Sequence, residues 1–215
     1  MLFDMETLAA PNRYKVLTAT VTPRPIAWVT TLSEDGVINA APYSFFNVMG
    51  HEPPTLAIGM LAGPGRFKDT ATNILATGEF VVNLVSERNA AAMNVTGIDA
   101  PPDIDELGLA GLTTIPSHAI RPPRIAESPV SFECRVLSSL VTGPRQTAVV
   151  GRILRAHVDD AVVLDKERCH IDAPALKLIG RMHGSGWYAR CTDLFQLDRP
   201  IWAERQRDDL RDRAS

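Results

Sequence analysis

Two basic residues, Arg66 and Lys68, stand between a glycine-rich loop and the start of a short predicted helix. Asp69 and Thr70, which follow Lys68, are residue types that favour a helix N-terminus, and Gly78 is a natural helix end. Because the free N–H groups and the dipole at a helix start favour an anion, these residues are a candidate phosphate site. An ordinary capped helix after a surface loop accounts for the same residues.

A second candidate is the aromatic and polar run Tyr43-Ser44-Phe45-Phe46-Asn47. A strand end that is buried only for structural reasons would not need Tyr43, Ser44 and Asn47 so close together. Aromatic rings beside hydrogen-bonding groups suit the wall of a ligand site. The alternative is a strand that ends in a polar loop.

A third candidate is the glycine-rich stretch 180–190, which contains His183, Trp187 and Tyr188. Its three glycines allow a close approach of the backbone, so this stretch could form the edge of a site for a ring-shaped ligand. A glycine loop packed by aromatic residues at a subunit contact is an equally good interpretation.

The commonest catalytic and nucleotide-binding motifs do not occur in the sequence. It has no Walker spacing, no Gly-x-Ser-x-Gly, no His-Glu-x-x-His and no Rossmann glycine pattern. His157 has no partner at metal-ligand spacing, and the adjacent pair Cys169-His170 would point to opposite faces of an extended segment. We therefore expect no metal site, and we expect Cys134 to be a small core residue.

Composition describes an ordinary globular protein. The chain has 215 residues, 45% of them hydrophobic and 22% charged, which suits one domain. A net charge of −3 gives no reason to expect nucleic acid or an anionic membrane as a partner. The first residues lack a basic stretch followed by an apolar one, and the three cysteines are widely spaced, so we expect a cytoplasmic protein without a disulfide framework.

The elements that position the candidate residues are mostly predicted strands. These cover residues 26–32, 37–41, 55–61, 79–85, 130–136, 147–157 and 161–164. Ser33-Glu34-Asp35-Gly36 is a hairpin turn between the first two strands. Short helices are expected after Asp69 and after Ser86, so the pattern is antiparallel rather than βαβ.

The remaining segments are expected to be irregular. Residues 1–24 read as an extended entry segment, because prolines flank Arg24. Residues 97–129 are rich in proline and are predicted to cross the surface of the β core, with one or two helical turns between Asp103 and Leu109. Residues 203–215 carry mixed charge and are expected to form a solvated tail.

Several short stretches carry a resemblance to a known family. In chain order they are Arg24-Pro25-Ile26-Ala27-Trp28-Val29-Thr30-Thr31, Asn39-Ala40-Ala41-Pro42-Tyr43-Ser44-Phe45-Phe46-Asn47, Lys68-Asp69-Thr70-Ala71-Thr72-Asn73, Gly78-Glu79-Phe80-Val81-Val82-Asn83, Pro122-Pro123-Arg124-Ile125-Ala126-Glu127-Ser128-Pro129 and Gly180-Arg181 with Trp187-Tyr188. Together they make the sequence similar to the flavin reductase-like family, whose members are FMN-binding split barrels. The resemblance covers about residues 20–190.

The resemblance implies a mainly β fold, an antiparallel Greek-key split β-barrel with a few short helices. It implies one FMN-binding domain over residues 1–202, followed by the tail, and a homodimer with FMN at or near the subunit interface. The resemblance assigns the phosphate and ribityl chain to Thr30, Thr31, Lys68 and Thr70. It assigns the lining of the flavin to Ser44, Phe45, Phe46 and Asn47. Asp69 and His183 complete the expected site.

The function implied is that of an NAD(P)H-dependent flavin reductase, in which nicotinamide passes hydride to flavin N5 and no catalytic side chain is needed. Such a protein can feed reduced flavin to a partner monooxygenase. The sequence departs from many nicotinamide-using members, which resemble one another in a histidine where this chain has Arg145-Gln146. His183 could substitute near the ring or could narrow the pocket.

Two other functions fit the same residues. One is an electron-transfer flavoprotein resembling flavoredoxin, which holds FMN tightly and receives electrons from a protein. The other is a non-catalytic FMN-binding module. The first predicts a yellow protein with little NAD(P)H turnover, and the second predicts bound flavin that neither donor reduces.

Overall fold

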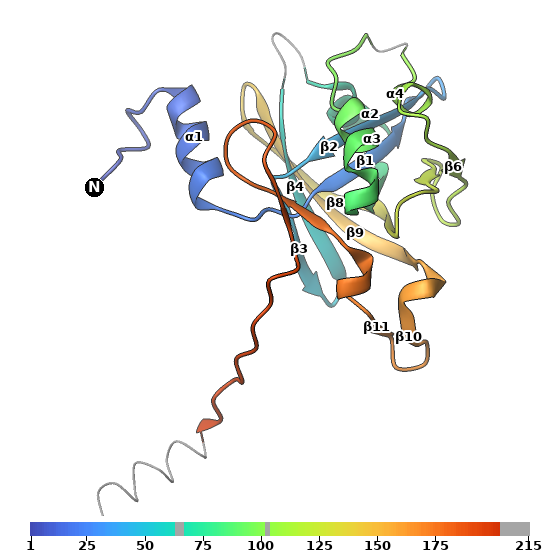
Figure 1. The fold of residues 1–215 in the computed structure, drawn as a ribbon. Coiled ribbons are helices and arrows are strands. Elements are labelled where there is room, and N and C mark those ends of the chain that lie inside the picture. Colours follow the sequence, from blue (N-terminus) through green and yellow to red (C-terminus); the bar gives the residue numbers. More distant parts are fainter. Residues whose placement is uncertain (63–66, 102–103, 203–215) are drawn as a thin grey trace, which may run out of the picture.

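In the computed structural model, an antiparallel sheet of seven strands forms the centre of the molecule (Figure 1). The structure describes residues 1–62, 67–101 and 104–202. In sheet order, the strands are β2 (Ile38–Tyr43), β1 (Ala27–Leu32), β5 (Glu79–Leu84), β8 (Val130–Gly143), β9 (Gln146–Val158), β4 (Pro54–Leu61) and β3 (Phe46–His51). The mainly β, antiparallel architecture predicted from the sequence is therefore confirmed.

The first hairpin follows directly from its turn residues. Ser33 donates its backbone N–H to the carbonyl of Val37 at 2.9 Å, and Gly36 takes a φ of +86°, where a side chain would be strained. This turn sets the register that pairs Ala27 with Tyr43 and Thr31 with Asn39. It thereby fixes Asn39 and Tyr43 on the strand that leads to the candidate site.

The two edges of the sheet meet at Phe45, between β2 and β3. The backbone N–H of Gly59 on β4 donates to the carbonyl of Phe45 at 2.7 Å. A Cβ on Gly59 would lie 3.1 Å from the Cβ of Phe45, so glycine permits this close approach. The contact closes the sheet toward a barrel and positions Ser44 and Phe45 at the seam.

The alternation of β1 divides the core into two clusters. Ala27 and Val29 face the barrel interior, where Phe80 and Ile58 pack against them with 0% exposure. Trp28 points the other way into a second cluster, and its indole nitrogen donates to the Thr96 hydroxyl at 2.8 Å. The period of two thus makes one strand serve two layers.

Helix α2 (Asp69–Thr77) packs against β1 and β2 (Figure 1). Ile74 and Ala71 bury their side chains in the barrel cluster, and Gly78 ends the helix with a φ of 72°. The predicted helix and its glycine end are confirmed. The N-cap is Lys68 rather than Asp69, and no side chain caps the helix start.

Two regular elements depart from the sequence-based expectation. Residues 10–20 form α1 (Ala10–Thr20) instead of an extended entry, because Pro11 is compatible with the first helical turn and the prolines flanking Arg24 lie beyond the helix. Only Thr18 is buried in α1, and the sequence of this segment shows no apolar periodicity that would predict a helix. The strand β3 was also not expected, and it forms by pairing with β4.

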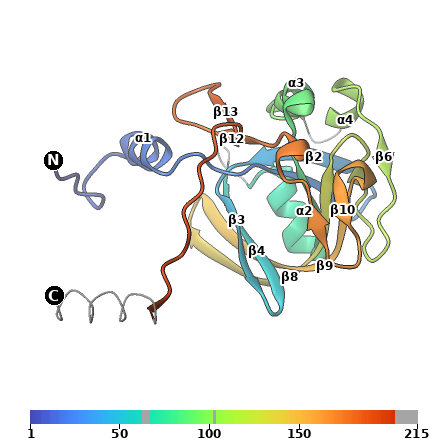
Figure 2. The same ribbon diagram turned by 60° about the horizontal axis from the view of Figure 1, so that its bottom comes forward.

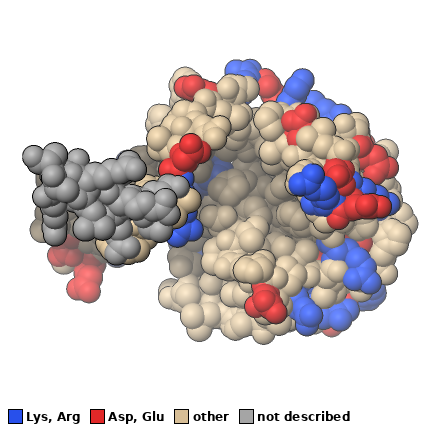
Figure 3. Space-filling view, turned by 90° about the horizontal axis from the view of Figure 1, so that it is seen from below, with Lys and Arg blue, Asp and Glu red and all other residues tan. Residues whose placement is uncertain are grey.

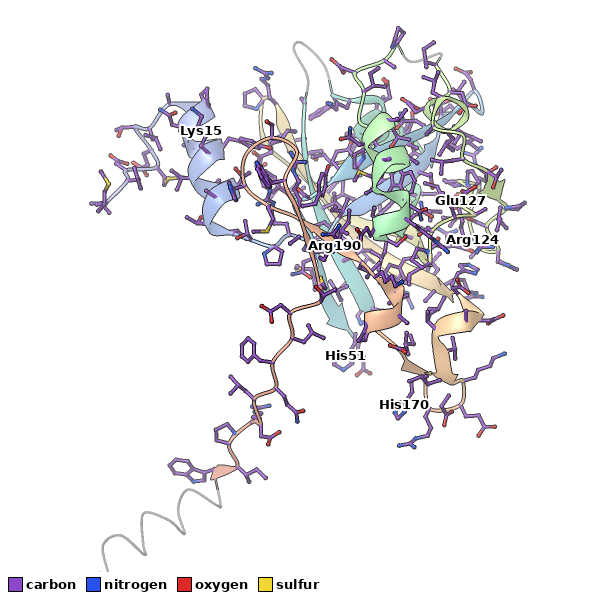
Figure 4. All side chains as sticks on the ribbon, viewed as in Figure 1. Lys15, His51, Arg124, Glu127, His170 and Arg190 are labelled. Atoms are coloured by element: carbon purple, nitrogen blue, oxygen red, sulfur yellow. The ribbon has the colours of Figure 1, made fainter. Side chains whose placement is uncertain are left out.

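The predicted excursion over residues 97–129 is confirmed as a mostly irregular segment. Two helical elements precede this segment, η1 (Glu87–Asn89) and α3 (Ala90–Val95). The segment itself contains α4 (Glu106–Leu109), β6 (Thr114–Ile115) and β7 (Arg124–Ile125). Arg124 and Glu127 lie on the opposite side of the molecule from Lys15 of α1 (Figure 4).

The chain after β9 forms small elements and then leaves the body. These are η2 (Asp160–Val162), β10 (Val163–Asp165), β11 (His170–Ile171), η3 (Pro174–Leu176), β12 (Ile179–Arg181) and β13 (Tyr188–Arg190). The segment beyond β13 runs away from the body on the side that carries α1 (Figure 2). The predicted tail, residues 203–215, lies outside the described residues. Among the described helices, none combines the length and apolar character needed to cross a membrane.

Candidate functional site

A pocket of about 580 Å³ opens between β2, the start of α2, α1 and the segment that follows α3. This volume lies within the range of about 300–1,000 Å³ that is usual for small-molecule sites. The site therefore has room for a ligand of nucleotide size.

The start of α2 forms the cationic part of the pocket. Lys68, Asp69 and Thr70 all line the wall, and Lys68 adopts an extended N-cap conformation with a φ of −66° and a ψ of 154°. The backbone N–H groups of the first helical turn have no partners within the helix. Since α2 spans nine residues, its dipole and the Lys68 ammonium together favour an anionic group here.

Four aromatic residues line the same pocket: Tyr14, Tyr43, Phe45 and Phe67. The rings of Tyr14 and Phe45 have centroids 6.1 Å apart with planes inclined by 57°, a tilted arrangement typical of aromatic pairs. Tyr14 comes from α1, so the helix that the sequence did not reveal supplies part of the wall. Such a surface suits a flat, apolar ring system.

A polar network joins the first turn of α2 to β2 and α4 in the pocket wall. Asn39 donates its side-chain amide to Glu106 at 3.0 Å and accepts a hydrogen bond from the Thr70 hydroxyl at 2.6 Å. The second carboxylate oxygen of Glu106 accepts a long 3.4 Å bond from the backbone N–H of Ala40, and the backbone N–H of Glu106 itself also lowers the pKa of this carboxyl. Burial raises the pKa of Glu106, since these donors offset it only in part and the charge of Asp69 raises it further.

Tyr43 contributes a buried hydroxyl that has no hydrogen-bond partner of normal geometry. Burial raises the pKa of Tyr43 to about 12, and the neighbouring Thr70 side chain lowers it only partly. A buried, unsatisfied hydroxyl costs free energy unless a ligand or water binds it. It marks this wall as a place for a polar ligand atom.

Arg24 holds several parts of the pocket wall together. Its buried guanidinium donates to the carbonyls of Thr18 and Val21 at 2.7 Å each, and to that of Met182 at 3.0 Å. A weaker contact of 3.4 Å reaches the hydroxyl of Ser44. Arg24 thus ties α1 and the β12–β13 hairpin to the seam where Ser44 lines the pocket.

The structure brings half of the sequence-predicted site residues together. The predicted residues that line the pocket are Ser44, Phe45, Lys68, Asp69 and Thr70. Arg66, which accompanied Lys68 in the prediction, lies outside the described residues. Their assignment to a flavin stays a prediction, but their proximity to one another does not depend on it.

The other predicted residues lie elsewhere in this chain. Thr30 and Thr31 are fully buried behind the pocket, where Thr30 donates to the carbonyl of Pro123 at 2.5 Å and Thr31 accepts from Asn73 at 3.0 Å. Their side chains are thus committed to the interior. A contact with a ligand would need their partners to change.

Phe46, Asn47 and His183 also lie outside the pocket wall. Phe46 packs in the barrel core, because the chain alternates after Phe45. Asn47 is exposed, and its side-chain oxygen accepts from the backbone N–H of Val48 at 2.8 Å. His183 is exposed in the β12–β13 connection, where its ring stacks on Trp187 at 6.3 Å between centroids.

The sequence did not point to Asn39 or Glu106 as site residues, and Tyr43 was named only as part of the aromatic and polar run. Asn39 and Tyr43 belong to the stretch that carried the family resemblance, and strand alternation places both on one face of β2, which could have grouped them. Glu106 offered no local signal, because only the packing of α4 against β2 brings it to the pocket.

Comparisons with known proteins agree with this architecture. The model of the flavin reductase like domain matches residues 19–171. The 2-nitrobenzoate 2-nitroreductase NbaA of Pseudomonas fluorescens is 34% identical, with a TM-score of 0.85 over 94% of this chain and 98% of that one. Component B of nitrilotriacetate monooxygenase from Bacillus cereus is also 34% identical, with a TM-score of 0.86 over 92% and 98%.

The fold alone extends to a more distant structure. A Shewanella frigidimarina protein with a split barrel domain is 20% identical and superimposes with a TM-score of 0.78, covering 93% of this chain and all of that chain. The family match spans most of the sequence and includes the strands and the helix start that form the pocket. This chain belongs to the flavin reductase-like domain family.

Proposed function

We propose that this protein binds FMN in the pocket beside α2 and reduces flavin with NAD(P)H. The observation that carries the proposal is the combination of Lys68 at an open helix start with an aromatic wall around one pocket of about 580 Å³. Family membership supports flavin-related oxidoreductase activity.

The residues present fit the chemical groups of FMN. A phosphate dianion suits the Lys68 ammonium and the N–H groups of the first turn of α2, which have no acceptor within the helix. The isoalloxazine ring suits the apolar faces of Phe45 and Phe67, while the unpartnered Tyr43 hydroxyl can donate to a polar ligand atom. FMN supplies the hydride-transfer chemistry when bound, and the protein binds it, orients it and excludes water.

NAD(P)H as electron donor and a monooxygenase as recipient belong to the same proposal. The structural relative named as component B of nitrilotriacetate monooxygenase supports a role in supplying flavin to an oxygenase. The relative named as a nitroreductase supports reduction of a further substrate on the same flavin. Lys68 and the aromatic wall would bind the flavin in the same way for either function, the supply of reduced flavin or the reduction of a further substrate.

A flavoredoxin-like electron carrier is the second candidate, and the Arg145-Gln146 pair favours it. Arg145 lies in the β8–β9 turn and accepts, through its carbonyl, the backbone N–H of Ala62 at 2.7 Å. The side-chain amide of Gln146 donates a hydrogen bond to the Thr142 hydroxyl at 2.8 Å. Neither supplies the imidazole that many nicotinamide-using relatives place before this strand.

We further propose that the protein is a cytoplasmic homodimer. Val48 and Met49 on β3 and Phe195 beyond β13 are large apolar side chains that this chain leaves exposed. Figure 3 shows charged side chains gathered on one side of the face seen from below, with uncharged residues over much of the rest. A second copy could cover such a surface. The three cysteines are free, which suits a reducing compartment.

A spectrum and a donor test examine the function directly. The protein is purified without added flavin, its visible spectrum is recorded, and NADH and NADPH are added anaerobically to separate samples with and without FMN. Bleaching with either donor is expected for a reductase. A flavin spectrum that persists with both donors would favour the electron carrier or a non-catalytic module.

Lys68→Ala tests the site. Loss of a charge-assisted phosphate contact is expected to weaken FMN binding by about 1.5–3 kcal/mol, or about 10- to 150-fold, without changing riboflavin affinity. Fluorescence quenching of each flavin measures both constants. Lys166→Ala, an exposed lysine between β10 and β11, is the matched control. Equal FMN affinity in the two variants would remove Lys68 from the site.

A further inference from the structure

We propose that Glu106 is a positioning residue of the pocket: it fixes the Asn39 amide against Thr70, so that Asn39 binds an uncharged polar part of the ligand. The inference rests on the proposed flavin site. It deepens that proposal, because it assigns the phosphate to the Lys68 end and the polyol chain or the polar ring edge to the Asn39 end.

The direction of the hydrogen bonds around Asn39 carries the argument. An ionised carboxylate only accepts hydrogen bonds, so the Asn39 atom 3.0 Å from Glu106 must be the amide nitrogen. The amide oxygen then faces Thr70 and accepts its hydroxyl proton at 2.6 Å. Glu106 therefore decides which way the Asn39 amide points.

The Asn39 amide is held by two buried partners, Glu106 and Thr70. Glu106 is 6% exposed and Thr70 is 1% exposed, whereas Asn39 is only half-buried and lines the pocket. The two buried partners hold the amide from behind. Because an amide has two N–H donors and an oxygen with two lone pairs, Asn39 keeps one donor and one lone pair for the pocket.

The charges around the pocket indicate which part of the ligand Asn39 meets. Asp69, Asp99 and Glu106 are acidic residues of the wall, and Lys68 is its basic residue within the described part of the chain. A phosphate near Glu106 would meet a carboxylate that, among the described residues, no cation neutralises by direct contact. An uncharged hydroxyl or imide group carries no such repulsion and can use both free positions of Asn39.

The test compares three flavins that share one ring: FMN, riboflavin, which lacks the phosphate, and lumiflavin, which also lacks the ribityl chain. Asn39→Ala and Glu106→Gln are each expected to weaken FMN and riboflavin binding by the same factor, about 3- to 10-fold. The Lys68→Ala effect, in contrast, should be confined to FMN. Whether lumiflavin follows riboflavin shows if Asn39 contacts the ring edge or the polyol, and either result supports an uncharged contact.

The double variant distinguishes positioning from a separate effect. If Glu106 acts through Asn39, adding Glu106→Gln to Asn39→Ala produces no further loss of affinity. Additive losses, losses confined to FMN, or unchanged affinities in Glu106→Gln would each overturn the inference. Thermal melting checks that each variant is folded, and the smaller change Asn39→Ser replaces Asn39→Ala if the latter is not.

Failure of this inference and failure of the proposed function give different results. If the wild-type protein binds none of the three flavins, the proposed function is wrong and the inference falls with it. If the wild type binds flavin and Lys68→Ala weakens FMN alone while the Glu106 and Asn39 variants bind normally, only the inference is wrong. Glu34→Gln, in the exposed β1–β2 turn, is the matched control for loss of a carboxylate.

Discussion

Two buried glutamates, Glu133 under the surface excursion and Glu106 at the pocket, have pKa values shifted in opposite directions. Glu133 is fully buried on β8 and accepts from the backbone N–H groups of His118 and Ala119 at 2.8 and 2.6 Å. The ring nitrogen of His157 lies 2.6 Å from the same carboxylate. Burial alone would raise the pKa of Glu133, but these hydrogen bonds outweigh it and hold the pKa below its usual value.

Glu106 has nearly the same burial and longer hydrogen bonds. It accepts from the Asn39 amide at 3.0 Å and from the backbone N–H of Ala40 at 3.4 Å, and its own backbone N–H also lowers its pKa. Burial therefore prevails, and the pKa of Glu106 is raised. The comparison teaches that burial does not decide the role of a carboxylate. The carboxylate with short hydrogen bonds anchors a loop, and the one with longer hydrogen bonds lines the pocket.

Removing the well-supplied carboxylate should have the largest effect. Glu133→Ala leaves two backbone N–H groups and His157 without their acceptor, so we expect the free energy of unfolding to fall by about 3–5 kcal/mol. Urea denaturation measures the loss. The flavin affinity of the folded variant should stay unchanged, because Glu133 lies outside the pocket wall.

The control for Glu133→Ala is Glu34→Ala in the exposed hairpin turn. It should leave the unfolding free energy within about 0.5 kcal/mol of the wild type. A loss below 1 kcal/mol for Glu133→Ala would mean that other contacts hold the excursion, and the contrast with Glu106 would then disappear.

The pH dependence of stability should have opposite signs at the two sites. Glu106, with a raised folded pKa, contributes stability below its ordinary value of 4.5, and this contribution is lost as the pH rises through the folded pKa. Glu133, with a lowered folded pKa, contributes stability above 4.5 and loses it as the pH falls. Unfolding free energies from pH 3.5 to 7.5 measure both.

Each glutamine variant isolates its own glutamate in that experiment. Glu106→Gln should gain stability relative to the wild type as the pH rises, whereas Glu133→Gln should approach the wild type as the pH falls. Lys68, Asp69, Asp99 and Tyr43 line the same pocket and are present in both proteins of the Glu106 pair, so the difference between the two proteins reports on Glu106. If the stability difference between variant and wild type changed with pH in the same direction for both glutamates, the assignment would be contradicted.

The strands could be predicted from the sequence because their signals are local. The Ser33–Gly36 turn and the apolar runs fixed β1, β2 and β5 with little help from the rest of the chain. Helix α1 could not be predicted, since its residues bury almost nothing and show no helical periodicity. The strand β3 forms by pairing with β4, although most of its residues are exposed.

The same distinction applies to the site. Lys68 and Ser44 could be found because a helix start and a polar strand end are recognisable within a few residues. Glu106 could not, since its sequence neighbourhood is only an acidic start to a four-residue helix. Its position at the pocket follows from a contact with Asn39 across 67 residues of chain. Thr30 and Thr31 show a different limit: a matching motif does not reveal how deeply a side chain is buried, and their assignment to the flavin stays a prediction.

The smallest effect is expected at Glu79, a partly exposed glutamate at the start of β5 that accepts a hydrogen bond from the same excursion. It accepts from the backbone N–H of Arg121 and from the Arg135 side chain, each at 3.0 Å, and its side chain is 16% exposed. Because Arg135 is 56% exposed, the ion pair is hydrated and screened. Glu79→Gln should therefore lower the unfolding free energy by no more than about 1 kcal/mol.

Salt separates the Glu79 contribution from that of Glu133. Urea denaturation in 0.05 and 0.5 M NaCl should show the Glu79→Gln loss shrinking with salt, while the Glu133→Ala loss stays nearly constant, because buried groups are screened less. Glu79 and Glu133 anchor the excursion through the same kind of backbone donors and differ in exposure. A Glu79→Gln loss as large as that of Glu133→Ala would show that the number of donors alone, without burial, determines how strongly a carboxylate holds this loop.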